Sequence, residues 1–219
     1  DDQNKLYARG PRFRMEAEMI RDNALAVSGL LSSKQGGPPV RPYQPPGLWE
    51  SKVGGENVTY EISAGEDRYR RGIYTVWKRT SPYPSFINFD ATERTACVVK
   101  RSRSNTPLQA LTLLNDPVYV EAAAALARRT LEEKPSVAVL ERMKYMFFVC
   151  LGRNPTELEL KTLHQLYREQ HDAARNDAAS AQKLLSGQEL PTGVALPEFA
   201  AWHAVAWALL NLNETITKG

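Results

Sequence analysis

Signals for the beginning of a helix recur through residues 106–219, and they constrain the fold more than any other feature of the sequence. A threonine–proline pair stands at 106–107 and an aspartate–proline pair at 116–117. A side-chain oxygen can cap a helix, and proline suits the first helical position because that position needs no N–H donor. Thr156 and Glu159 form the T-x-x-E pattern of a capping box. These signals predict a mainly α fold.

The spacing of apolar residues gives the extent of each helix. In residues 106–219 we expect helices over 107–114, 118–133, 137–151, 157–185 and 197–212. Ser136 is the predicted cap of the third of these, and Gly152 follows its C-terminus. Short connections between consecutive helices favour an antiparallel helical bundle. A further helix is predicted over Phe13–Leu31.

A segment rich in proline and glycine lies between this N-terminal helix and the helical half. Residues 36–55 contain five prolines and five glycines, which excludes regular secondary structure there. Apolar residues interleave with the prolines, so we expect an ordered strap over the core. Alternating apolar residues over Asn57–Ser63 predict a short strand. Asp67–Arg79 fits a helix slightly better than a strand, and the SPYPS that follows ends it.

We expect all 219 residues to form a single mainly helical domain with at most one or two short strands. Its parts are the N-terminal helix (1–31), the strap and a basic irregular middle (32–105), and the helical half (106–219). The polar opening DDQNKLYARGPR suggests a fragment of a longer protein. No apolar run reaches about 18 residues, so no membrane span is predicted.

Positive charge is concentrated in the middle of the chain. Residues 68–103 contain nine Lys or Arg against only two acids, Asp90 and Glu93, whereas the whole chain has a net charge of +3. A total this small does not by itself indicate a nucleic-acid binder. The basic middle is therefore the candidate site.

This basic region allows two interpretations. The first is an anion-binding face formed by Arg70, Arg71, Lys78, Arg101, Arg103 and the helix start at Thr106, with Trp49 or Trp77 as a stacking platform. The second is an internal network in which these cations pair with Asp90, Glu93, Glu16, Glu18 or Asp22. Arginine suits both, because its planar fork binds carboxylates and sulfates with two hydrogen bonds.

The sequence gives weaker evidence for a disulfide, a metal site or a haem site. Cys97 and Cys150 are 53 residues apart and fit two buried free thiols better than a disulfide, although either is consistent with the sequence. His164, His171 and His203 lack metal-ligand spacing and fit surface or interfacial positions. No C-x-x-C-H pattern is present, so we expect neither a metal nor covalently attached haem in this chain.

The chain resembles the PSD domain, a domain of unknown function (DUF1553) of planctomycete-type bacterial proteins. The resemblance rests on MEAEMIRDNALAVSGLLS, the GGPPV–PPGLWE strap, the R-x-N-T-P-L-Q-A-L-x-L-L-N-D block at 103–116, and LGRNPTELEL. It extends from Asp1 to the NLNE segment ending at Glu214 and corresponds to the C-terminal part of the domain. The 103–116 block is the most specific of these motifs.

The resemblance implies a cellular location and neighbouring domains, but no particular reaction. Such proteins typically carry an upstream cytochrome-like region, where any haem would be bound, and are exported. No catalytic residues are established for the family. Many relatives are encoded beside polysaccharide-degrading and sulfatase genes, which favours acidic glycans as ligands.

We therefore expect a non-catalytic binding or scaffolding module of an exported, periplasmic or envelope protein, with the upstream region and an acidic or sulfated polysaccharide as partners. The alternative is a glycan hydrolase or lyase that uses Asp90 and Glu93 as a carboxylate pair. Nucleic-acid binding is disfavoured by the implied export.

Overall fold

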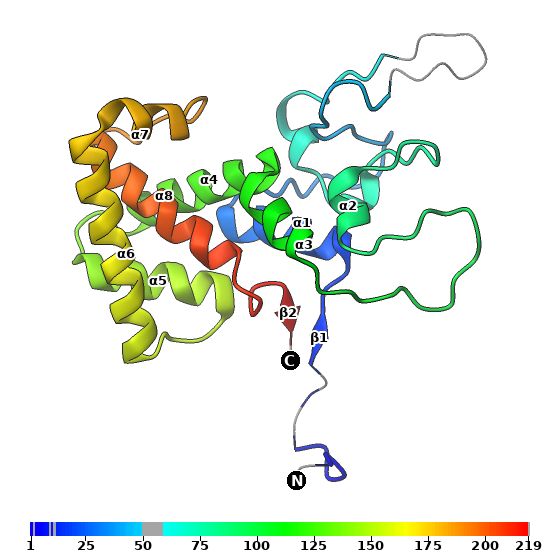
Figure 1. Ribbon diagram of the computed structural model, residues 1–219, viewed down its shortest axis with the longest axis horizontal. Coiled ribbons are helices and arrows are strands. Elements are labelled where there is room, and N and C mark those ends of the chain that lie inside the picture. Colours follow the sequence, from blue (N-terminus) through cyan, green and yellow to red (C-terminus); the bar gives the residue numbers. More distant parts are fainter. Residues whose placement is uncertain (2, 9, 11, 50–58, 219) are drawn as a thin grey trace.

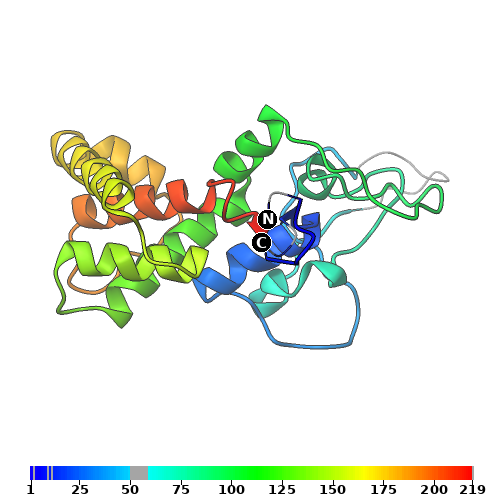
Figure 2. The same cartoon turned by 90° about the horizontal axis from the view of Figure 1, so that it is seen from below.

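The computed structural model describes residues 1, 3–8, 10, 12–49 and 59–218. The described chain is mainly α, as predicted, with one short two-stranded sheet. In Figure 1 the helices α4 to α8 gather at one side, and the strap, α2 and the long connecting loops lie at the other. The view from below shows the same division, with both termini near the middle (Figure 2).

The helical half follows its local signals closely. Its helices are α3 (Pro107–Asn115), α4 (Pro117–Glu133), α5 (Val139–Leu151), α6 (Glu157–Asn176), α7 (Ala178–Leu184) and α8 (Leu196–Leu210). Asp116 caps α4 by accepting a hydrogen bond from the Val118 N–H. The capping box of Thr156 and Glu159 is complete. Gly152 ends α5 in the left-handed conformation, with a φ of 73°.

Three predicted details of these helices are wrong. α5 begins after Ala138 rather than Ser136, because residues 135–137 form a turn that Arg142 holds by donating to the Lys134 carbonyl at 2.7 Å. The helix expected to reach Leu185 breaks at Asp177, whose side chain accepts from the Ser180 N–H and starts α7. Thr106 precedes α3, but its side chain makes no capping hydrogen bond.

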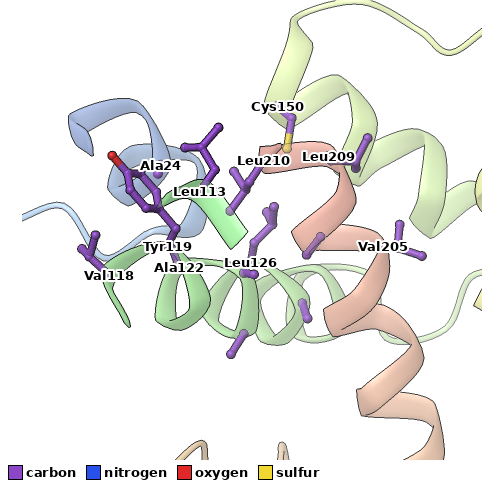
Figure 3. Packing of buried hydrophobic residues seen from close by; sticks show 14 of the residues in the cluster. Ala24, Leu113, Val118, Tyr119, Ala122, Leu126, Cys150, Val205, Leu209 and Leu210 are labelled. Atoms are coloured by element: carbon purple, nitrogen blue, oxygen red, sulfur yellow. The ribbon is translucent and has the colours of Figure 1, made fainter. Parts of the chain in front are cut away.

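The core is built where α8 packs against α4 and α6. Alanines at 122–125 and 127 are all buried on α4, and such small side chains let neighbouring helices approach closely. Figure 3 shows Tyr119 and Leu126 of α4 in the same cluster as Val205, Leu209 and Leu210 of α8. Cys150 of α5 is buried beside Leu209 and is a free thiol, whereas Cys97, expected to be buried, is exposed.

His203 is inside this core rather than at a surface or interfacial position as predicted. It is fully buried on α8, and its ring lies 5.6 Å from that of Trp207. Burial disfavours the charged imidazolium and lowers the pKa of His203 below its usual 6.5. His164 and His171 are only partly buried.

The N-terminal helix is shorter than predicted. Phe13–Arg14 forms β1, which pairs antiparallel with β2 (Thr217–Lys218), so backbone pairing takes these residues out of the helix. α1 then covers Ala17–Ser28 and ends at Gly29, whose φ is 80°. It packs against α4. The strands thus join the segment before α1 to the C-terminal segment.

The strap is ordered over its described residues, as expected. Val40 is buried, and it exchanges backbone hydrogen bonds of 2.8 Å with Tyr74 and Val76. These bonds, with bridges from Ser32 to Arg70 and from Val40 to Thr75, take the place of the helix predicted over 67–79. That segment contains only the short 3-10 helices η1 (Gly65–Tyr69) and η2 (Gly72–Tyr74).

Two other predictions for this part also need correction. The SPYPS segment was expected to end a helix, but it leads into one. Its second proline, Pro84, is in the first turn of α2 (Pro84–Asn88). Residues 57 and 58 of the predicted strand lie outside the described residues. Residues 59–63 form no strand, and the Ser63 N–H bonds to the Arg41 carbonyl instead.

The position of η2 on α1 depends on a glycine. The Gly72 N–H donates to Asp22 at 2.6 Å, and a β-carbon at Gly72 would lie 3.0 Å from Glu18 and from Phe86. We expect Gly72→Ala to lower the free energy of unfolding by about 1–3 kcal/mol, because the added methyl group must displace α1 or α2. Urea denaturation measures this. Gly10→Ala, where a β-carbon has no neighbour within 4 Å, should have almost no effect; equal effects would contradict the packing argument.

The burial of His203 predicts acid sensitivity. The unfolded chain binds a proton near the usual pKa, but the folded chain resists it, so the free energy of unfolding should decrease as pH falls below about 6.5. His203→Leu should weaken this dependence, which urea denaturation at about pH 7.5 and about pH 5.5 would measure. Parallel stability–pH curves for the two proteins would show that His203 does not titrate as argued.

Candidate functional site

A cleft of about 370 Å³ lies in the basic middle of the chain. One wall is the C-terminal part of the loop 91–106, which joins α2 to α3 and projects away from the helices (Figure 1). The opposite wall comes from residues 14–16, the end of β1 and the two residues that lead into α1. Its lining residues are Arg14, Met15, Glu16, Phe89, Asp90, Thr92, Val98, Val99, Lys100, Arg101, Ser102 and Arg103. The cleft therefore has more cations than acids.

The loop 91–106 is closed at its base by Asp90. The backbone of Asp90 has a φ of 61°, a left-handed conformation that an aspartate tolerates better than most residues. Its carboxylate accepts from the Ser104 N–H at 2.7 Å and from the Ser104 hydroxyl at 2.8 Å. Gln109 of α3 donates to the same hydroxyl at 3.1 Å. Asp90 thus ties the two ends of the loop together.

Arg14 fastens the same loop from the other side. Its guanidinium donates to the Ser104 carbonyl at 3.0 Å, to the Asn105 and Asn213 side chains at 3.2 Å each, and to Gln109. It therefore joins β1, the loop, α3 and the C-terminal segment. Sequence reasoning missed this residue, because its partners are far away in the chain.

Arg101 is paired with acids of the first helix. It makes two hydrogen bonds to Glu18, of 2.6 and 3.0 Å, and approaches Glu16 to 3.2 Å. Burial alone would raise the pKa of Glu18, but hydrogen bonding and the charge of Arg101 outweigh it, so the pKa lies below 4.5. Arg101 is thereby committed to a partner within the protein.

Lys100 and Arg103 are different, because both are exposed and form no ion pair in the described part of the chain. The Arg103 guanidinium lies 5.9 Å from the Phe13 ring. Thr106 is also exposed at the start of α3. Together, Lys100 and Arg103 are the cations of the cleft that can meet a ligand without breaking an internal contact.

The other predicted cations lie elsewhere. Arg70 is buried, donates to the Gly36 and Pro38 carbonyls of the strap, and stacks 3.9 Å from the Tyr74 ring, so it cannot belong to an exposed anion-binding face. Arg71 is exposed and donates to Asp22 at 3.2 Å. The Lys78 ammonium is shielded from solvent, 4.8 Å from the Trp49 ring. None of these residues lines the cleft.

Trp49 and Trp77, the two tryptophans predicted as stacking platforms, have no ring face open to a ligand. Trp49 is buried, donates to Gln44 at 2.7 Å, and lies 4.9 Å from the Tyr60 ring. Trp77 is partly buried against the core, and the Arg94 guanidinium covers its ring at 4.7 Å. Both rings are already in contact with a cation of the same chain, which explains why aromatic residues interleave with cations in the sequence.

A family model described as PSD1, protein of unknown function (DUF1553), matches residues 1–167. The chain belongs to this family. The match includes the cleft and the 103–116 block, but not residues 168–219, so it is shorter than the resemblance that extended to Glu214. No curated protein and no solved structure matches the chain.

The PSD1 match brings no catalytic assignment, and the structure offers little support for one at the predicted carboxylates. Asp90 is engaged by Ser104, and Glu93 is exposed with no hydrogen bond or ion pair among the described residues. Within the same residues, no group of three His, Cys, Asp or Glu side chains could hold a metal ion. No described helix has the length and apolar character needed to cross a membrane.

The pairing of Arg101 with Glu18 predicts a pH-dependent loss of stability on mutation. Arg101→Met should lower the free energy of unfolding by about 1.5–3 kcal/mol near neutral pH, because Glu18 loses a charged partner. Glu18 has a lowered pKa, so this contribution is present above about pH 4.5 and is lost as pH falls through the lower folded value. Urea denaturation of both proteins, near neutral pH and again well below about pH 4.5, measures this difference in the free energy of unfolding.

The matched control is Arg103→Met, which removes an exposed cation of the same loop. We expect its effect on unfolding to stay within about 0.5 kcal/mol. Equal losses for the two variants, or a loss at Arg101 that does not change with pH, would contradict the pairing argument.

Proposed function

We propose that the chain is a non-catalytic binding module that takes an acidic or sulfated glycan in its cationic cleft. The observation that carries the proposal is that some cations of the cleft are used in internal contacts whereas others are exposed. Arg14 and Arg101 are used to build the cleft, whereas Lys100 and Arg103 are exposed and unpaired in the described structure. Such cations bind sulfate or carboxylate through charge-assisted hydrogen bonds.

The shape of the cleft supports a polymer ligand more than a small ion. Its volume of about 370 Å³ exceeds what one sulfate needs, and its lining combines cations with the apolar side chains of Met15 and Phe89. Sugar rings present both hydroxyl groups and apolar C–H faces, so a charged sugar unit would match both kinds of surface. Lys100 offers a point charge and Arg103 a planar fork.

The proposal includes a setting. We place the protein outside the cytoplasm, in the periplasm or cell envelope, with a cytochrome-like region of the same protein as its partner and the site of any haem. Family resemblance supports this part. The carboxylate-pair alternative has weaker support, because Asp90 accepts hydrogen bonds that close the loop 91–106.

Calorimetric titration with a heparin-derived oligosaccharide, an oligogalacturonate and a neutral maltooligosaccharide tests the proposal. We expect one acidic ligand to bind and to bind more weakly as salt is raised, because screening weakens contacts between exposed charges. Lys100→Ala/Arg103→Ala should weaken this binding by about tenfold or more.

The matched control is Lys161→Ala/Arg168→Ala, which removes the same charge from exposed positions on α6. It should bind like the unmodified protein. Equal weakening in both variants would indicate a general charge effect, and no binding of any acidic oligosaccharide would overturn the proposal. Tighter binding of a single-stranded oligonucleotide would replace it with a nucleic-acid function.

A further inference from the structure

The end of the loop 91–106 carries an unusual apolar surface. Val98 is 55% exposed and Val99 is fully exposed, next to the exposed Cys97. The loop that carries them extends away from all the helices in both views (Figures 1 and 2). Adjacent β-branched residues favour burial or a strand, yet here they lie in a segment without regular structure. Their exposure on a projecting loop leaves an apolar surface that the chain itself does not cover.

Cations surround these valines. The loop contains Arg94, Lys100, Arg101 and Arg103 against the single acid Glu93. Arg101 is neutralised by Glu18, and the Arg94 guanidinium lies over the Trp77 ring at 4.7 Å. Lys100 and Arg103 are exposed and have no carboxylate partner among the described residues. An apolar tip with a basic rim is complementary to a surface that is negative outside and apolar inside.

We propose that this loop docks the protein on an anionic lipid bilayer. Val98 and Val99 enter the boundary between headgroups and acyl chains, and Lys100 and Arg103 contact the lipid phosphates. The proposal goes beyond glycan binding because it places Val98 and Val99 in a lipid layer, whereas a soluble acidic polymer has no acyl chains to receive them. It needs no membrane-spanning helix.

The base of the loop is suited to this role. Asp90 and Arg14 hold Ser104, and Arg101 is bound to Glu18 of α1, so the returning part of the loop is fixed at several points. The returning part of the loop, which begins with Val98 and Val99 and lines the cleft, is therefore held in a defined position. A loop without these fasteners could fold its valines against the body of the protein and hide them from water.

Co-sedimentation with vesicles tests the proposal. We expect the protein to bind vesicles of phosphatidylcholine with phosphatidylglycerol and to bind pure phosphatidylcholine vesicles far more weakly. Val98→Ser/Val99→Ser should reduce binding to the anionic vesicles by about tenfold, because two apolar side chains no longer enter the lipid. Leu158→Ser/Leu184→Ser, which removes exposed leucines of α6 and α7, should leave the binding unchanged.

The two proposals fail separately. Val98 and Val99 also line the cleft, so the two proposals are told apart on the unmodified protein. Vesicle binding without oligosaccharide binding overturns the glycan proposal alone, and oligosaccharide binding without vesicle binding overturns docking alone. Equal binding to neutral vesicles, or an unchanged affinity of the valine variant for anionic vesicles, would overturn it. If the valine variant instead dissociates a dimer seen by analytical ultracentrifugation, and neither protein binds vesicles, the tip contacts a second copy and the lipid proposal is wrong.

Discussion

Two buried arginines hold together the part of the chain that has almost no regular secondary structure. Arg21 of α1 donates to the carbonyls of Arg68 and Arg70 at 2.7 and 2.6 Å, and Arg70 in turn donates to carbonyls of the strap. A strap rich in proline has few N–H groups of its own, so its carbonyls need donors from elsewhere. The guanidinium group supplies several donors in one plane. Without these two side chains, the strap and the middle would have little to fix them to α1.

This arrangement also explains how the cleft is positioned. Gly72 lies against Glu18 of α1, and Glu18 is the carboxylate that holds Arg101 of the projecting loop. The same helix therefore anchors the strap, the middle and the loop through successive turns. Asp22, one turn further along, accepts from the Gly72 N–H and from Arg71. α1 is thus the element on which the irregular half of the structure is assembled.

The sequence predicted the structure well where the information is local. The caps at Asp116 and Thr156 and the glycine at 152 act within a single turn, so their effects can be read from neighbouring residues. The roles of the arginines could not be predicted in this way. Arg101 is 83 residues from Glu18 in the chain, and an exposed arginine such as Arg103 looks the same in sequence as a buried one such as Arg70. The break at Asp177 was predictable in principle, because aspartate is one of the residues favoured as the N-cap of a new helix.

The unpaired cations of the loop are the feature that internal structure does not explain. The two buried arginines of the described chain, Arg21 and Arg70, donate to backbone carbonyls, as burial requires. Lys100 and Arg103 could be neutral residues without any loss of the contacts that shape the cleft, and like charges in one loop repel one another. Their presence costs the folded state a little stability, and apart from the approach of Arg103 to the Phe13 ring at 5.9 Å neither cation makes an internal contact among the described residues. The same reasoning applies to Val98 and Val99, whose exposure contributes nothing to the core. Charge and apolar surface that the fold itself does not use are most simply explained by an external partner.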